Sequence, residues 1–254
     1  MANRRGRPGR RARSAAIYTP VAALLILFIA VFGVSVFFRI ARIEVTGASK
    51  YSAEEIIRAS RLETGDNLIF ADHDAAARRI RAELPYVNEV KLTRRLPDVL
   101  AIEIRESAPI AVVTAEGRLW IIDSGGKILE ESNNAGAAGL IRVAGITPTE
   151  PKPGEKLAVP EESGTRRAYL LDILGAIETN GMSADVDSLD VSNISGITFR
   201  YLRRFDVNFG SGDDALFKLQ KLPGVAAKLR EDREEREGTI EFTKQNETHF
   251  VPKQ

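Results

Sequence analysis

The residue types that most often carry out chemistry in proteins are scarce in this chain of 254 residues. There is no Cys, which excludes disulfides, thiol nucleophiles and thiolate metal sites. The two His residues, His73 and His249, lie far apart in the sequence and do not form a pair. Ser, Asp and Glu are plentiful, but without an activating base no nucleophilic or paired-carboxylate site can be singled out. The sequence therefore predicts a protein that is not an enzyme and holds no metal, cofactor or small-molecule substrate.

Two further patterns could suggest ligand chemistry, and both have a simpler explanation. The stretch "GSGDD" (210–214) lacks the Lys and Ser/Thr that complete a phosphate-binding loop, so it favours a strand-to-helix turn. All six charges in the first 38 residues are Arg, and the other 30 basic and all 35 acidic residues follow them. A mildly acidic main body is not typical of a nucleic-acid-binding protein.

The N-terminal region has the pattern of a membrane anchor. No charged residue occurs from Ser14 to Phe38, and the apolar stretch "IYTPVAALLILFIAVFGVSVFF" (17–38) would form a helix of roughly 33 Å, against about 30 Å for the hydrocarbon core of a bilayer. The preceding Arg cluster predicts a cytoplasmic tail at 1–16, a transmembrane helix at 17–38 and an extracytoplasmic body. A nucleic-acid-binding arm is the alternative for the Arg cluster. A cleaved signal peptide would have a shorter apolar region that ends in small residues.

The elements that would have to position any binding residue begin directly after this segment. In "YVNEVKLTRRLPDVLAIEIRES" (86–107), Val90 and Leu92 alternate with polar residues, and so do Leu100, Ile102 and Ile104 after Pro97-Asp98. This period of two on both sides of a turn predicts an antiparallel hairpin with one buried face.

A strand and two helices are expected before the hairpin. "ARIEVTG" (41–47) alternates like a strand, and Ser52 with Glu55 forms a capping-box pattern ahead of a short helix. A second helix is expected over 72–84 and ends at Pro85. The order is β-α-α-β-β over residues 39–107, with both helices on one face of a three-stranded sheet.

These stretches resemble the FtsQ/DivIB family of bacterial cell-division proteins. The resemblance rests on "IEVTGASKYSAEEII", "GDNLIFAD", "LPYVNEVKLTRRLPDVLAIEIRESAPIAVV" and "LWIIDSGGKIL", in this order after a signal anchor. It is strongest over residues 40–130. It implies that residues 39–107 form the family's POTRA domain and that residues 108–254 resemble its β domain.

The second half carries its own secondary-structure patterns. A hairpin is expected over 117–131, a strand near 140–143, a helix over 165–181 and strands near 185–191, 196–201 and 204–209. A helix is expected over about 213–233, interrupted at Pro223-Gly224, with Leu216, Leu219, Val225 and Leu229 facing inward. "TIEF" and "THFV" would be closing strands. The predicted fold class is α+β: one transmembrane helix, a β-α-α-β-β domain, and a mostly antiparallel β domain with two packed helices.

The resemblance also implies a function and the residues that serve it. Family members are non-enzymatic scaffolds of the divisome that bridge FtsL and FtsB/DivIC partners, so we expect a single-pass protein of the cell membrane at the division septum. Partner contacts of the β domain correspond to the strand at the end of the chain: Thr243, Lys244, Thr248, His249, Phe250 and Val251. Contacts of the POTRA hairpin correspond to Glu89, Leu92 and Arg94.

Three alternatives remain open from the residues alone. The closing strand is expected to be an edge of the sheet, where another chain's strand could pair with it; the alternative is an edge that is only solvated, without a partner. The chain could be a POTRA protein of a secretion or assembly system, although tandem repeats and a many-stranded barrel are not visible. It could also be a signal-anchored cell-wall hydrolase, although no clustered catalytic residues are seen.

Overall fold

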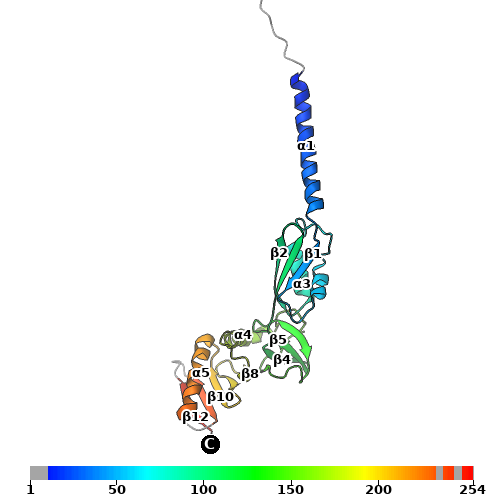
Figure 1. Ribbon diagram of the computed structural model, residues 1–254. Coiled ribbons are helices and arrows are strands. Elements are labelled where there is room, and N and C mark those ends of the chain that lie inside the picture. Colours follow the sequence, from blue (N-terminus) through cyan, green and yellow to red (C-terminus); the bar gives the residue numbers. More distant parts are fainter. Residues whose placement is uncertain (1–10, 233–236, 243–247, 254) are drawn as a thin grey trace, which may run out of the picture. The chain divides into compact units, whose positions relative to one another are not determined.

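The computed structural model describes residues 11–232, 237–242 and 248–253. The chain divides into two compact units. The first contains Met1–Ile80 and Glu89–Arg105, and the second contains Arg81–Asn88 and Glu106–Gln254. Each unit has its own sheet (Figure 1).

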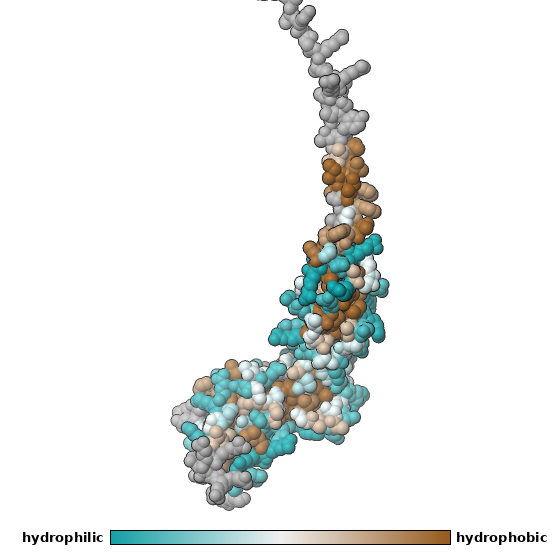
Figure 2. All heavy atoms as spheres, viewed as in Figure 1, coloured by the Kyte–Doolittle hydropathy of each residue, from teal (hydrophilic) through white to brown (hydrophobic). Residues whose placement is uncertain are grey.

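Helix α1 spans Arg11–Phe37. It begins earlier than expected, so Pro20 lies within the helix and not in its first turn. Large apolar side chains, from Val21 to Phe37, are exposed along it, and Figure 2 shows this part of the chain as hydrophobic. Over the residues that the structure describes, no helix combines the length and the apolar character that crossing a membrane requires.

The elements after α1, over residues 42–106, confirm the predicted β-α-α-β-β order. They are β1 (Arg42–Thr46), α2 (Ala53–Ser60), α3 (His73–Glu83), β2 (Val87–Arg95) and β3 (Val99–Glu106). The strand order is β1-β3-β2, with β1 parallel to β3. The first two residues of β2 belong to the second unit, so this strand runs from one unit into the other.

Local sequence explains where α2 begins. The backbone N–H of Glu55 donates to Ser52 Oγ over 3.3 Å, and the Ser52 N–H donates to Glu55 Oε2 over 2.8 Å. This is the capping box that the sequence predicts. The hydrogen bond from the Ser52 backbone to the carboxylate is the main cause of the lowered pKa of Glu55.

Strand β3 supplies much of the core of this part of the chain. Leu100, Ile102 and Ile104 are buried as predicted, whereas Glu103 and Arg105, which alternate with Ile102 and Ile104, are exposed. Ala101 is also buried, since β3 is the central strand. Gly47, at the end of β1, has φ +81, and a Cβ there would lie 2.1 Å from the Ile104 carbonyl oxygen. Only glycine fits this close approach of two backbones.

The second unit is built on a nine-stranded mixed sheet. Its strand order is β12-β11-β10-β9-β8-β7-β4-β5-β6. Five of the neighbouring pairs are antiparallel, and β10–β11, β8–β7 and β7–β4 are parallel. The strands are β4 (Ala111–Ala115), β5 (Arg118–Ile122), β6 (Ile128–Ser132), β7 (Ile141–Ala144), β8 (Val186–Asp190), β9 (Ile197–Tyr201), β10 (Phe205–Gly210), β11 (Gly238–Phe242) and β12 (Thr248–Pro252).

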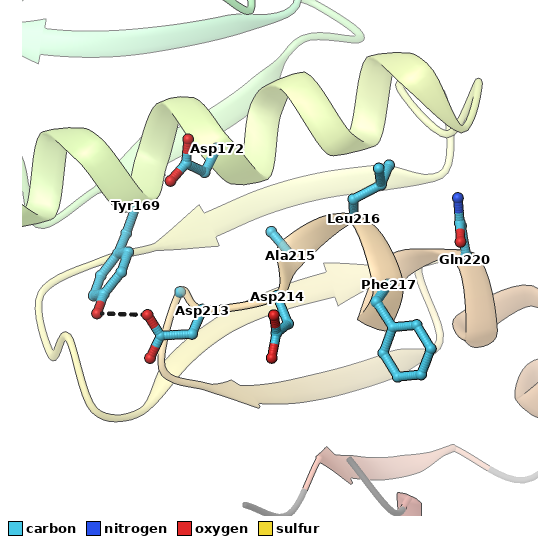
Figure 3. A pocket seen from close by; sticks show the side chains of 9 residues that line it. Tyr169, Asp172, Asp213, Asp214, Ala215, Leu216, Phe217 and Gln220 are labelled. Atoms are coloured by element: carbon cyan, nitrogen blue, oxygen red, sulfur yellow. Dashed lines mark hydrogen bonds between the residues drawn. The ribbon is translucent and has the colours of Figure 1, made fainter.

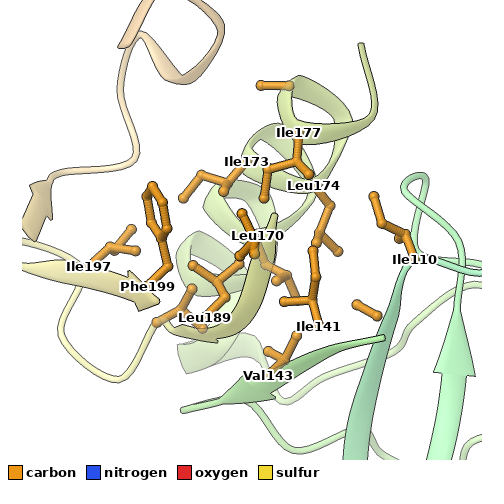
Figure 4. Close-up of a cluster of buried hydrophobic side chains, with 14 of the residues drawn as sticks. Ile110, Ile141, Val143, Leu170, Ile173, Leu174, Ile177, Leu189, Ile197 and Phe199 are labelled. Carbon is orange, nitrogen blue, oxygen red and sulfur yellow. The ribbon is translucent and has the colours of Figure 1, made fainter. Parts of the chain in front are cut away.

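Helices α4 (Gly164–Thr179) and α5 (Ala215–Asp232) contribute to the same hydrophobic core as the sheet. Figure 4 shows Leu170, Ile173 and Leu174 of α4 facing strand residues such as Leu189 and Phe199. The opposite side of strands β9 to β11 is polar, as expected for a sheet with one solvated face.

Two expectations for this unit are wrong. Pro223 does not interrupt α5, which runs through it, because Leu219, Leu222 and Ala226 are buried in the core and hold the helix on the sheet. Leu216, expected to face inward, is 46% exposed, and Leu222 and Ala226 occupy the inward positions instead.

Candidate partner-binding surface

Strand β12 is an edge of the nine-stranded sheet, as the sequence predicts for the closing strand. It pairs antiparallel with β11, in a register that places Phe242 opposite Thr248, Glu241 opposite His249 and Ile240 opposite Phe250. On its other side, no strand pairs with it among the residues that the structure describes. Backbone donors and acceptors on that side can therefore accept another chain.

The register determines which backbone groups point outward. The Lys253 N–H donates to the Glu237 carbonyl over 3.0 Å, so this opposed pair is a hydrogen-bonded one. Hydrogen-bonded and non-hydrogen-bonded pairs alternate along an antiparallel ladder. The N–H groups of His249 and Val251 therefore point toward β11, whereas those of Thr248 and Phe250 point away from it. Pro252 occupies the next position at which an N–H would point away from β11, and as a proline it has none.

The side chains of β12 alternate in the perpendicular direction. Phe250 is half-buried and packs on the core, with its ring centroid 6.3 Å from that of Phe205. His249 and Val251 point to the other face and are exposed. Thr243 and Lys244, the other two predicted contacts of this region, lie outside the described residues.

The opposite edge of the sheet differs from β12 because another segment covers part of it. The Ile128 N–H donates to the Glu155 carbonyl over 2.9 Å, and the Gly154 N–H donates to the Ile128 carbonyl over 2.8 Å. Lys127 and Lys156 form a further antiparallel bridge. Residues 154–157 thus cover the outer edge of β6 at its start. By contrast, the described residues leave the outer side of β12 free of strand pairing.

A charged cluster lies on the solvated face of the sheet, next to the β12 edge, and it was not predicted from the sequence. Arg200 Nη1 contacts Asp206 Oδ1 at 2.8 Å, and Arg200 Nη2 lies 3.8 Å from Glu237 Oε2. Lys253 Nζ lies 3.7 Å from the same carboxylate group. Arg200 and Asp206 are opposed across the β9–β10 hairpin. Polar residues alternate with apolar ones on both sides of this turn, and that pattern could have indicated that the two charges share the solvated face.

The hairpin residues predicted to bind a partner have different environments. Glu89 is exposed and forms a long ion pair with Arg105, at 3.5 Å. Leu92 is half-buried. The guanidinium of Arg94 donates to the carbonyls of Leu68 and Ile69 over 2.9 and 3.1 Å, so this side chain holds a loop of its own unit.

The "GSGDD" stretch is a strand-to-helix turn between β10 and α5, as predicted. A pocket of about 580 Å³ lies beside it, and Figure 3 shows Asp172, Asp213 and Asp214 among its lining residues. Asp213 accepts a hydrogen bond from the Tyr169 hydroxyl over 3.1 Å, which raises the pKa of Tyr169. In the part of the chain that the structure describes, no group of His, Asp and Glu is arranged to hold a metal ion.

Trp120 lies in the core of the second unit and is only 8% exposed. Trp120 is therefore a core residue and not an exposed interaction anchor.

Comparison with known proteins defines the class of this chain. Residues 38–107 match the family described as the POTRA domain, FtsQ-type, so the β-α-α-β-β part is a POTRA domain. The cell division protein DivIB of Clostridium tetani is 24% identical over 216 residues, which is 85% of this chain and 80% of that protein. The cell division protein FtsQ of Corynebacterium glutamicum is 31% identical over 111 residues, 42% of this chain and 50% of that protein. The chain therefore contains a POTRA domain of the FtsQ type and is similar to cell division proteins named DivIB and FtsQ.

Proposed function

We propose that this protein is a non-enzymatic scaffold of the bacterial divisome that binds membrane-protein partners of the FtsL and FtsB/DivIC type at the septum. The observation that carries the proposal is the outer edge of β12, which the described residues leave free of strand pairing. The similarity to proteins named for cell division supports a role in that process. A scaffold needs binding surfaces and no catalytic centre.

The proposed mode of binding is addition of a partner strand beside β12. Main-chain hydrogen bonds give affinity in this mode, and pockets for alternate side chains give specificity. Thr248 and Phe250 would supply outward N–H groups. His249 and Val251, exposed on the solvated face, would contact side chains of the partner. Thr243 and Lys244 are proposed to extend this surface, and the Arg200–Asp206 cluster lies beside it.

Proline substitution at Thr248 tests this mode. Thr248→Pro removes an outward donor in phase with the native Pro252, so the ladder to β11 keeps its hydrogen bonds. We expect the variant to bind an FtsB/DivIC-type partner about tenfold more weakly, roughly the 1.4 kcal/mol scale of one net hydrogen bond. Titration of the purified partner into the full chain in detergent measures this affinity.

Two matched variants separate the backbone from the side chain. Thr248→Ala keeps the N–H and should bind as the parent does. His249→Pro removes an inward donor, so it should release β12 from β11 and expose the amides of both strands to hydrogen exchange. Phe250→Pro also removes an outward donor, but it deletes a ring that packs on Phe205, so Thr248 gives the cleaner result. Parent-like binding by both Thr248→Pro and a chain lacking 248–254 would show that the docking site is elsewhere.

We also propose that residues 17–38 anchor the protein in the cytoplasmic membrane, with 1–16 in the cytoplasm and the body outside. Support comes from the uncharged run between Ser14 and Phe38 and from the exposed large apolar side chains of α1. An exposed apolar surface of this extent is unfavourable in water. Arg residues before the run, in greater number than those just after it, favour this orientation.

A topology reporter checks the orientation. An enzyme that is active only in the cytoplasm, fused after Gln254, should give no signal, because the body is translocated. The same reporter fused after Arg13 should be active and serves as the control. A strong signal from the fusion after Gln254 would contradict the proposed orientation.

A second contact surface is proposed on the POTRA hairpin. Glu89 and Leu92 would meet a partner there, and Arg94 would contribute by fixing the neighbouring loop through its two carbonyl contacts. Exposure of Glu89 and partial exposure of Leu92 support this assignment.

A further inference from the structure

One end of the POTRA domain is hydrogen-bonded to the chain segment that directly follows α1. The Leu68 N–H donates to the Phe38 carbonyl over 2.9 Å, and the Ile40 N–H donates to the Asp66 carbonyl over 2.8 Å. The Ala41 N–H donates to the carbonyl of Asp98, in the β2–β3 turn, over 2.8 Å. The loop 65–70 and the turn 96–98 are therefore fixed beside residues 38–41.

Both of these segments carry a large apolar side chain on the surface. Phe70 is 66% exposed and Leu96 is 62% exposed. Outside α1, no other large hydrophobic side chain of the described residues is as exposed. Two such side chains at one end of a small domain are unfavourable in water unless an apolar phase or a partner covers them.

Arg94 connects the two segments. It lies two residues before Leu96, and its guanidinium donates to the carbonyls of Leu68 and Ile69, directly before Phe70. Arg42 and Arg95 lie at the same end, and both contact the carboxylate of Glu44, at 3.1 and 2.9 Å. Two guanidinium groups thus share one carboxylate, and Arg39 nearby is exposed. This excess of positive charge suits binding to the phosphate groups of lipids.

We propose that Phe70 and Leu96 rest in the lipid headgroup layer of the membrane that α1 crosses, and so seat this end of the POTRA domain on the bilayer. The inference depends on the proposed anchoring of the chain. Leu68 is hydrogen-bonded to Phe38, which lies one residue beyond the end of α1. Phe70 is two residues further along the chain, so it lies at most about 7 Å from Leu68. The headgroup layer is about 5–8 Å deep on each side of the hydrocarbon core, which matches this reach. Arg side chains at this depth would place their charge in the interface.

Tryptophan fluorescence tests the contact. Trp120 is the single Trp of the chain, so Trp120→Phe gives a background in which an introduced Trp reports alone. We expect Phe70→Trp and Leu96→Trp, in the full chain reconstituted in phosphatidylcholine vesicles, to lose most of their emission when the lipid carries bromine near the headgroup. Lys91→Trp is the control, because Lys91 is exposed on β2 and lies roughly 16 Å from Leu96 along the strand. Its emission should not change.

Each outcome distinguishes this inference from the proposed anchoring. If the chain stays in the membrane after alkaline extraction but neither Phe70→Trp nor Leu96→Trp is quenched, the headgroup contact is wrong and the anchor stands. If Lys91→Trp is quenched equally, the domain does not rest on this end. If alkaline extraction releases the chain, both the anchor and the contact are wrong.

Discussion

Replacing Ile102 by Asp is expected to unfold the POTRA domain. Ile102 is fully buried on β3 and lies opposite Val45 of β1. The substitution deletes an apolar side chain from the core and places a carboxyl group there without a partner. Loss of the side chain alone costs about 2–5 kcal/mol, and the buried carboxyl adds to this. That sum approaches the whole stability of a typical domain.

Hydrogen exchange resolved by peptide measures this effect in each unit separately. For Ile102→Asp in detergent, we expect protection to be lost in peptides from α2 and α3, while peptides from α4 keep theirs. Glu103→Ala is the matched control, because Glu103 is exposed on the same strand and its ion pair with Lys91 is a surface one. It should change stability by less than about 0.5 kcal/mol. Unchanged protection of α2 and α3 in Ile102→Asp would show that this face of β3 is not a core.

The second large effect is expected at a buried polar cluster in the second unit. Asp123 is 8% exposed and accepts hydrogen bonds from Ser107 Oγ and from the Lys127 N–H, both over 2.8 Å. Lys127 is 9% exposed, and its Nζ donates to the Val87 carbonyl over 2.7 Å. Burial lowers the pKa of Lys127, and the nearby Asp123 charge partly opposes this shift.

Asp123→Ala should therefore destabilise the second unit by about 3 kcal/mol, because two donors lose their acceptor and the buried ammonium group of Lys127 loses a nearby opposite charge. Fluorescence of Trp120, in the core of the same unit, reports unfolding in urea. In a Lys127→Met background the ammonium group is absent, so the same Asp123→Ala change should cost less. A double-mutant cycle isolates this difference. Equal costs in the two backgrounds would mean that Asp123 acts only through its hydrogen bonds.

Local patterns were sufficient to predict the POTRA elements. The capping box at Ser52 and Glu55 marked the start of α2, and the alternation around Pro97-Asp98 marked a hairpin with one buried face. These signals depend on near neighbours in the sequence, and the packing of the domain did not override them.

Packing decided the elements that were missed. Strand β4 was not assigned because "AVVTA" has almost no alternation, and it lies within the sheet with its first three residues buried. Lys127 and Lys218 are both buried, which their residue type does not suggest. Lys218 reaches the carbonyls of Phe209 and Ser211, contacts that exist only once α5 lies on β10.

For the candidate site, the sequence predicted the closing strand as an edge, and the structure agrees. The direction of each backbone group could not be predicted, because it depends on the register between β11 and β12. The covered edge at β6 was also missed, since the covering segment 154–157 has no strand pattern of its own.

The strand order of the sheet also has a consequence for the order of folding. Strands β4–β5–β6 and β8–β9–β10 are two runs of consecutive antiparallel neighbours, which need only short loops to close. The β11–β12 hairpin joins the sheet only through the parallel β10–β11 pair, on the far side of the α5 crossover. Closing a longer loop costs more entropy, so this pairing should form after the local ones. A partner strand would then meet its template only on molecules whose sheet is already assembled, and partly folded chains would not compete for the partner.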